Sequence, residues 1–361
     1  MAAPLLEADF VVARRTFEVV ARLYLGAGER LSLFGPSGAG KTTCLEAIAG
    51  WVELKQGRIR LDDRVVNAAR GRRSRNLTER PVEPRDRGVA LVRQPTTLFS
   101  HLSVRANVTY GTRDRILFGG GSVEGLLEAV GLDGLGDAMP DALSGGQRQR
   151  TSLARAMARP FHALLLDEPF SAVDMPSRGL LRSLAIEASS RAGAVAMLVT
   201  HDLTEAQAFG QRLAIMDEGR ILQMGSSAEL VRQPLTVRVA ELCGYRSFVP
   251  HNTGKLWALH PDRFVEGAWP ERGVVLAGTV LAVQPFGARF SCEMAALVSS
   301  GLGRGHAVAD MGDGTGGFTP GGPGVVRVHA ESPPRMGDKW EVTALDPPLV
   351  ESVSPASSRE E

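Results

Sequence analysis

The segment GPSGAGKTT, residues 35–43, combines glycines, a lysine and two hydroxyl side chains in a spacing suited to binding phosphate. It matches the pattern G-x-x-x-x-G-K-[ST], in which glycines let backbone N–H groups surround a β-phosphate. Lys41 can reach the terminal phosphates, and the hydroxyl of Thr42 can ligate Mg²⁺. We therefore expect the phosphates of a nucleotide to be bound by Ser37, Gly38, Ala39, Gly40, Lys41, Thr42 and Thr43.

Two adjacent carboxylates, Asp167 and Glu168, follow the continuous apolar run at residues 163–166. Such a run is typical of a strand buried on both faces of a parallel sheet. In a chain with a phosphate-binding loop the two carboxylates can have different roles, one as a metal ligand and the other as a base. Asp167 would hold the shell of Mg²⁺, and Glu168 would deprotonate a water aimed at the γ-phosphate. Because neighbours on an extended chain point in roughly opposite directions, we expect only one of them on the Mg²⁺ side.

A third apolar run, VAMLVT at residues 195–200, ends directly before His201. If this run is another strand of the same sheet, the imidazole can reach the terminal phosphate held by the loop. A lone histidine after a strand is more often structural, so this prediction depends on the other motifs.

The segment LSGGQ, residues 143–147, places Gly145 and Gly146 in the first turn of a helix predicted to run to Pro160. Ser144 and Gln147 can form a capping box at this helix start. A cap needs no glycine, and each glycine costs about 1 kcal/mol relative to alanine inside a helix. The glycines therefore indicate that another group approaches the backbone closely at this point.

The composition is that of a soluble globular protein, with 43% hydrophobic and 22% charged residues in a chain long enough for two or three domains. No apolar run approaches the roughly 20 residues that span a bilayer, and the N-terminal residues do not resemble a secretory signal. The 41 basic and 40 acidic residues balance, so no nucleic-acid partner is expected. Three widely spaced cysteines indicate neither a disulfide framework nor a zinc site.

Hydrophobic patterns predict the elements that position these motifs. A strand precedes the phosphate loop and a helix follows it to Gly50, while an amphipathic helix is expected over residues 122–135. Residues 212–225 read as a hairpin, and a helix follows with a break at Pro234. These elements predict an α/β P-loop fold with a mostly parallel sheet. The family that the motifs resemble implies an ATPase cassette over residues 1–242, with a helical lobe at about residues 95–160.

The remaining residues, 243–361, are expected to form a second domain. Alternating apolar stretches separated by glycine and proline predict a small all-β barrel. The segment 301–324 has ten glycines in 24 residues and is predicted to be a flexible loop.

Six segments in this order, GPSGAGKTT, VRQPTTLF, LSGGQRQR, LLLDEP, SAVD and VTHD, resemble the nucleotide-binding subunit of ATP-binding cassette (ABC) transporters over residues 5–242. The resemblance implies ATP and Mg²⁺ as cofactors, with Thr42, Gln94 and Asp167 around the metal. It also implies that Glu168 is the catalytic base, that His201 is the γ-phosphate switch and that Gln94 couples to a membrane subunit.

In that family two cassettes pack head to tail, which would explain the glycines of the LSGGQ segment. The resemblance implies a homodimer in which Ser144, Gly145, Gly146 and Gln147 of one chain contact ATP held by the other, while Asp174 helps to join the two. It further implies polytopic membrane permease subunits and a separate solute-binding protein as partners. The chain would then lie at the cytoplasmic face of the cell membrane.

One family feature is missing, because the aromatic residue that often stacks on adenine is replaced near Val11 and Ala13 by small residues. Phe10 or Phe17 can substitute. The second domain resembles the barrel appended to many importer ATPases, and LDDRVVNAARG and RANVTYG favour the molybdate type. The tail lacks the Ser-x-Arg-Asn pattern of molybdate barrels, so sulfate, ferric iron and polyamine remain open as the transported solute.

Three other classes of protein fit less well. Cassette ATPases of DNA repair or translation usually carry paired cassettes, heptad inserts or zinc cysteines, none of which the sequence shows. A P-loop kinase or GTPase would not need the LSGGQ segment, and no [NT]-K-x-D motif occurs. A module that binds nucleotide only as a structural group would not need both Glu168 and His201.

Overall fold

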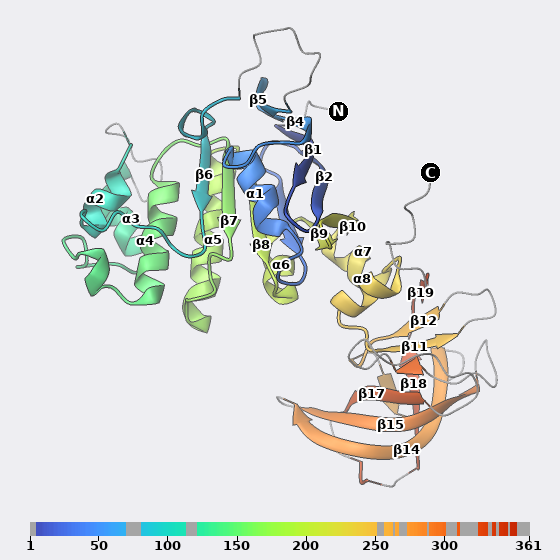
Figure 1. Cartoon of the computed structure of the whole chain (residues 1–361). Helices are drawn as coiled ribbons and strands as arrows, with labels where there is room; N and C mark the ends of the chain where they lie inside the picture. The colour runs from blue at the N-terminus through green and yellow to red at the C-terminus, as the bar shows by residue number, and fades with distance from the viewer. Residues whose placement is uncertain are drawn as a thin grey trace. The chain divides into compact units, whose positions relative to one another are not determined.

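The computed structural model describes residues 5–69, 81–112, 121–250, 256–262, 264–266, 273–286, 289–300, 309–310, 324–330, 334–336, 339–345 and 347–351. The chain divides into two compact units, residues 1–227 and 228–361, and each is described by itself (Figure 1). The domain boundary expected after residue 242 stays a prediction, and residues 228–242 are described with the second unit.

A ten-stranded sheet forms the centre of the first unit, in the order β5-β4-β1-β2-β10-β9-β3-β8-β7-β6. Its strands are β1 Leu6–Ala13, β2 Glu18–Leu25, β3 Arg30–Phe34, β4 Gln56–Leu61, β5 Arg64–Ala68, β6 Val89–Val92, β7 Ala163–Asp167, β8 Val195–Thr200, β9 Arg212–Asp217 and β10 Arg220–Gly225.

The sheet is mixed, which corrects the expectation of a mostly parallel one. Strands β9, β3, β8, β7 and β6 are parallel neighbours. The pairs β1/β2, β4/β5 and β9/β10 are antiparallel, because each pair is joined by a connection of only a few residues. The β9/β10 pair confirms the predicted hairpin, and the parallel half carries the predicted site.

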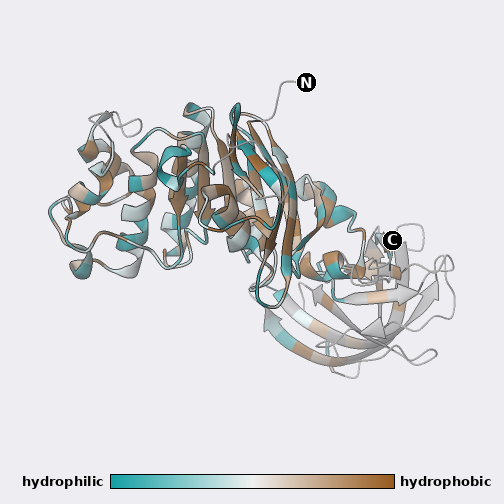
Figure 2. Ribbon diagram, turned by 45° about the horizontal axis from the view of Figure 1, so that its top comes forward, coloured by the Kyte–Doolittle hydropathy of each residue, from teal (hydrophilic) through white to brown (hydrophobic). Residues whose placement is uncertain are grey.

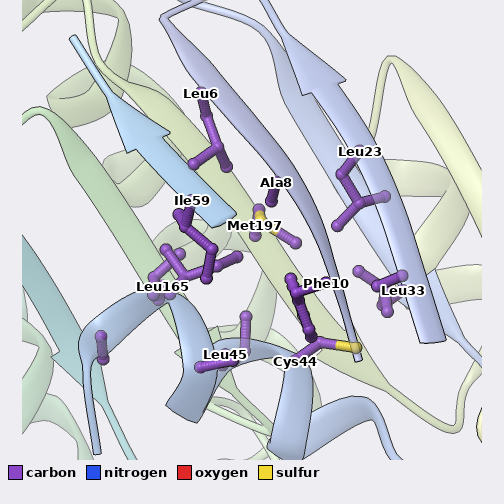
Figure 3. Packing of buried hydrophobic residues seen from close by; sticks show 14 of the residues in the cluster. Leu6, Ala8, Phe10, Leu23, Leu33, Cys44, Leu45, Ile59, Leu165 and Met197 are labelled. Carbon is purple, nitrogen blue, oxygen red and sulfur yellow. The ribbon is translucent and has the colours of Figure 1, made fainter. Parts of the chain in front are cut away.

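The parallel strands are buried on both faces, as their continuous apolar sequences predict. Every residue of β7 and β8 is buried. Leu165 packs on one side of the sheet with Leu45 of α1 (Lys41–Ala49), as Figure 3 shows. Leu164 packs in a second cluster with Leu153. Figure 2 shows brown, hydrophobic strands at the centre of the first unit, so the helices that pack on them cover an apolar surface.

The helical lobe contains α2 (Val104–Thr109), α3 (Val123–Ala129) and α4 (Gly145–Met157), with the short 3₁₀ turn η3 (Pro140–Ala142). A second 3₁₀ turn, η1 (Pro84–Asp86), lies directly before β6. The helix expected over residues 122–135 is present but ends at Ala129. Gly131 takes the left-handed conformation, with φ of 67°, and its N–H donates to Glu128 O. This is a glycine helix stop, which the sequence places inside the apolar pattern.

Two further helices of the first unit, α5 (Met175–Arg191) and α6 (Leu203–Phe209), follow β7 and β8. The side chains of Cys44, Cys243 and Cys292 are buried. Within the described residues, no helix is long and apolar enough to cross a bilayer.

The second unit begins with the helical pair that the break at Pro234 predicts and continues as two antiparallel sheets. The sheets have the orders β16-β11-β12-β19 and β13-β18-β14-β15-β17. Its elements are α7 Ser227–Arg232, α8 Val237–Leu242, β11 Ser247–Pro250, β12 Leu256–Leu259, β13 Phe264–Glu266, β14 Gly273–Phe286, β15 Arg289–Ser300, β16 Ala309–Asp310, β17 Gly324–Ala330, β18 Lys339–Leu345 and β19 Leu349–Val350. A closed barrel stays a prediction, and the glycine-rich loop lies almost wholly outside the described residues.

Candidate nucleotide-binding site

The phosphate loop joins β3 to α1, and its glycines are required by the backbone. A Cβ on Gly35 would lie 1.9 Å from Met216 O, and Gly40 has φ of 98° with Val19 2.8 Å from the place of a Cβ. Lys41 folds back over the loop, where its Nζ donates to Gly35 O and Pro36 O at 2.8 Å each. The loop is therefore closed around its own lysine.

A cleft of about 420 Å³ opens at the N-terminus of α1. Burial lowers the pKa of Lys41, while nearby carboxylates led by Glu168 act in the opposite direction. The cleft is lined by Arg14, Phe17, Ser37, Gly38, Gly40, Lys41, Thr42, Thr43, Glu168 and Val199. Six of the seven predicted phosphate-binding residues thus line one cavity, whereas the side chain of Ala39 packs in the hydrophobic core.

Two predicted Mg²⁺ ligands meet at the floor of the site. The Thr42 hydroxyl donates to Asp167 Oδ1 at 3.1 Å, across 125 residues of sequence. Burial raises the pKa of Asp167, which is 4% exposed, and the hydrogen bond from Thr42 opposes that shift. A hydroxyl and a carboxylate are the hard oxygen donors that Mg²⁺ prefers, so the pair fits the ion.

The third expected ligand, Gln94, lies apart from this pair on the loop after β6. It is exposed, and its Nε2 donates to Ser171 Oγ at 3.4 Å. Ser171 Oγ in turn donates to Glu168 O at 3.0 Å. In this conformation Gln94 is connected to the backbone of Glu168 rather than to Thr42 or Asp167.

Glu168 does not continue β7, which corrects the reasoning from an extended chain. Its φ of 44° lies in the left-handed region, a conformation that costs a residue with a Cβ about 1–2 kcal/mol. The Glu168 N–H donates to Val199 O at 3.0 Å. This turn brings Glu168 into the lining of the cleft, while Asp167 bonds to Thr42.

His201 and Glu168 lie together, as the two apolar runs predicted. His201 Nδ1 is 3.0 Å from Glu168 Oε1, and the His201 side chain is 59% exposed. With Nδ1 held by the carboxylate, Nε2 is the ring nitrogen that is left for another partner.

The LSGGQ segment starts α4 with the full capping box. Gln147 N donates to Ser144 Oγ at 3.2 Å, and Ser144 N donates to Gln147 Oε1 at 2.8 Å. A Cβ on Gly146 would lie 3.1 Å from Ala172 O, so this glycine has a packing reason within its own chain. A Cβ on Gly145 would meet only Ala172 Cβ at 3.9 Å. Packing in the same chain therefore leaves Gly145 unexplained.

Asp174 caps α5, since its Oδ2 accepts from Ser177 N at 3.1 Å, and this hydrogen bonding holds the pKa of Asp174 below its usual value. Of the two phenylalanines considered for adenine, Phe10 is 1% exposed in the core, whereas Phe17 lines the cleft. Sequence reasoning missed Arg14, whose Nε donates to Thr43 Oγ1 at 3.0 Å. Its position in the short β1–β2 turn was the only available signal.

A glycine-rich loop before a helix, with paired carboxylates at the end of a parallel strand, defines a P-loop nucleotide-binding protein. Residues 20–171 match the family described as "ABC transporter". The chain is 38% identical to the sulfate/thiosulfate import ATP-binding protein CysA of Synechococcus elongatus, over 67% of this chain and 69% of that one. It therefore belongs to the ABC transporter family, as an ATP-binding protein with the family's ATPase cassette.

Other relatives carry different solutes in their names. The Fe(3+) ions import ATP-binding protein FbpC of Pseudomonas fluorescens is 38% identical over 63% of this chain and 62% of its own length. The spermidine/putrescine import ATP-binding protein PotA of Frankia alni is 37% identical over 70% of this chain and 53% of its own length. The matched segment thus spans between 53% and 62% of the length of these two relatives.

Solved structures confirm the fold of the cassette. An ATP-bound bacterial Atm1-family ABC exporter superposes with a TM-score of 0.56 at 22% identity, covering 66% of this chain and 41% of that one. A dimeric ATP-binding cassette in a post-hydrolysis state, bound to ADP and Pi, gives a TM-score of 0.51 at 23% identity, covering 62% of this chain and 98% of that one.

Proposed function

We propose that this chain is the ATP-hydrolysing subunit of an ABC importer and that Glu168 is its general base. The contact of 3.0 Å between Glu168 and His201 beside the phosphate loop carries this proposal. The P-loop amides and Lys41 would hold the β- and γ-phosphates. Glu168 would take the proton of the attacking water, and His201 would contact the γ-phosphate through Nε2.

Thr42 and Asp167 would hold Mg²⁺, with Gln94 joining them on a change of its side chain. When bound, the ion neutralises charge on the β- and γ-phosphate oxygens. Phe17 would stack on the adenine, because it is the aromatic residue of the cleft lining.

The working state would be a homodimer with two ATP molecules between the chains. The lining of the P-loop cleft includes no residue of 144–147, so the LSGGQ segment is free to serve a second chain. Gly145 has no packing reason of its own, and the positive end of α4 suits a phosphate. Asp174 would join the two cassettes beside this contact.

A groove of about 440 Å³ offers a docking place for a membrane permease subunit. Its aromatic lining includes Trp51 and Tyr110, which are 51% and 55% exposed. Arg93 stacks 4.3 Å from the Trp51 ring centroid, and Arg155 lies 5.2 Å from that of Phe99. This combination suits an amphipathic helix that carries an acidic residue. Docking of such a helix would hold the chain at the cytoplasmic face of the membrane.

The solute is proposed to be an oxyanion, either molybdate or sulfate. The cassette segments LDDRVVNAARG and RANVTYG favour the molybdate type, and a sulfate/thiosulfate import protein is among the relatives. Relatives named for Fe(3+) and polyamines keep those solutes as alternatives. The choice between molybdate and sulfate is tested by uptake of the labelled anions. Cells that contain the permease and the solute-binding protein are compared with and without this chain.

The chemistry is tested by comparing Glu168→Gln with Asp167→Asn. Removing a positioned general base typically lowers the rate by about 10²–10⁴, while the phosphate contacts stay intact. Glu168→Gln should therefore bind MgATP normally, hydrolyse it slowly and accumulate as an ATP-bound dimer. Asp167→Asn should instead weaken Mg²⁺-dependent binding. A Glu168→Gln protein with the parental rate of hydrolysis would refute the assignment.

The composite site is tested with mixed dimers of Lys41→Ala and Ser144→Arg chains. If ATP is shared in trans, each mixed dimer retains one intact site and recovers part of the ATPase activity. Absence of any recovery would show that Ser144 does not act on ATP held by another chain.

A further inference from the structure

We propose that Gln149, a buried glutamine of α4, is a positioning residue that holds the backbone of Glu168 for ATP hydrolysis. Gln149 is 4% exposed. Its Nε2 donates to Glu168 O at 2.9 Å, and its Oε1 accepts from Ala172 N at 3.0 Å. One amide side chain thus clamps both ends of the segment that follows β7. The inference rests on the proposed role of Glu168 as the base.

Glu168 needs such support because its backbone is strained. Its left-handed φ of 44° persists only if the surroundings hold it. The Glu168 N–H is fixed to Val199 O at 3.0 Å, and its carbonyl accepts from both Gln149 and Ser171. Because hydrogen bonds fix both the N–H and the carbonyl of Glu168, the position of its Cα is defined, and the carboxylate lies within hydrogen-bond distance of His201. Loss of the Gln149 bond would release the carbonyl on the α4 side.

The clamp also connects Glu168 to the LSGGQ segment. Gln149 lies on α4, whose first turn carries Ser144 to Gln147. The start of α4 packs against the same segment, since a Cβ on Gly146 would lie 3.1 Å from Ala172 O. A movement of α4 would therefore be transmitted to Glu168. The geometry of the base in one cleft would depend on how α4 is seated.

The test uses Gln149→Met, which keeps the length of the side chain and removes both hydrogen bonds. A misplacement of about 1 Å can cost about 10²-fold in rate, so we expect turnover at saturating MgATP to fall by about 10- to 100-fold. The affinity for MgATP should stay at the parental value because the phosphate loop is untouched. Ser189→Ala is the control, since it removes a buried polar group, the Ser189 hydroxyl, whose hydrogen bond to Ile186 O stays within α5.

A second variant, Gln149→Glu, separates the two bonds. An ionised carboxylate can still accept from Ala172 N but cannot donate to Glu168 O, and its buried charge beside that carbonyl destabilises the fold. At a pH where this carboxyl is ionised, Gln149→Glu should therefore lose turnover and have a urea midpoint no higher than that of Gln149→Met. If Gln149→Glu hydrolysed ATP at the parental rate, the bond to Glu168 O would have no part in positioning, and the proposal would be wrong.

A double variant distinguishes positioning from general stability. In a Glu168→Gln background, Gln149→Met should lower the residual rate by less than about twofold, the usual error of additivity. An equal fractional loss in both backgrounds would mean that Gln149 acts independently of Glu168, which overturns the proposal. A parental rate in Glu168→Gln contradicts the base itself, whereas a parental rate in Gln149→Met beside a slow Glu168→Gln contradicts only the positioning role.

Discussion

Arg87 holds the C-terminal end of α1, the helix that carries the phosphate loop at its other end. The Arg87 side chain is buried, and it donates from Nη1 to Ile48 O at 3.0 Å and from Nε to Val82 O at 2.8 Å. Replacing it by methionine keeps much of the apolar stem and removes both bonds, together with a longer one from Nη1 to Ala47 O at 3.4 Å. We expect the first unit to lose about 2 kcal/mol of stability, because the lost hydrogen bonds contribute more than the desolvation of the guanidinium costs.

Hydrogen bonds from a charged group contribute about 1.5–3 kcal/mol each, so the two bonds together contribute about 3–6 kcal/mol. Burial opposes them, since it lowers the pKa of Arg87 to about 10. At about 1.4 kcal/mol for each pKa unit, this desolvation costs about 3 kcal/mol, which methionine avoids. A cation at the C-terminal end of a helix adds about 0.5 kcal/mol. The difference is a modest loss rather than the 3–5 kcal/mol of a broken buried ion pair.

Urea unfolding gives the stability of each variant, and hydrogen exchange of the α1 amides locates the effect. Arg85→Met is the matched control, because the Arg85 side chain is 84% exposed and pairs with Asp86 at the surface. We expect this control to change stability by less than about 0.5 kcal/mol. If Arg87→Met were as stable as the parent or more so, desolvation would exceed the bonds, and the capping argument would be refuted.

Three further predictions concern single side chains. Burial raises the pKa of Glu205, so the folded chain favours the protonated carboxyl, and the stability that this protonation contributes is lost as pH rises. Glu205→Gln should therefore stabilise the chain at mildly alkaline pH but not in acid. Urea unfolding at both pH values measures the difference. Gly145→Ala should match or exceed the parental unfolding midpoint, because a Cβ meets only ordinary contact and alanine costs less than glycine in a helix. It should nevertheless abolish ATP-dependent dimers in light scattering. Phe17→Ala should weaken MgATP binding by about tenfold in calorimetry, since stacking on a base contributes about 1–3 kcal/mol.

The parts of the fold and site that could be predicted are those with a local physical cause. The phosphate loop requires glycine at Gly35 and Gly40 whatever the rest of the chain does, so its pattern is visible in the sequence. The apolar runs before Asp167 and His201 predict strands buried on both faces. Parallel neighbours then bring their carboxyl ends to one edge of the sheet, where Glu168 and His201 meet.

The parts that could not be predicted depend on contacts between distant segments. Phe10 and Phe17 are equivalent in sequence, and only the pairing of β1 with β2 and β4 decides that Phe10 is in the core. The left-handed turn at Glu168 has no local signal, because glutamate does not favour it. The mixed character of the sheet follows from three short hairpins, one of which the sequence predicted, and from the long-range antiparallel pair β1/β4.

The carbonyl of Glu168 is where two parts of the cassette meet. Gln94 donates to Ser171, which donates to this carbonyl, and Gln94 directly follows Arg93 of the docking groove. From the other side Gln149 donates to the same oxygen from α4. A permease helix in the groove and an ATP-bound partner at α4 would therefore act on one backbone group. Because that group belongs to the proposed base, hydrolysis would respond to both contacts without a separate signalling element.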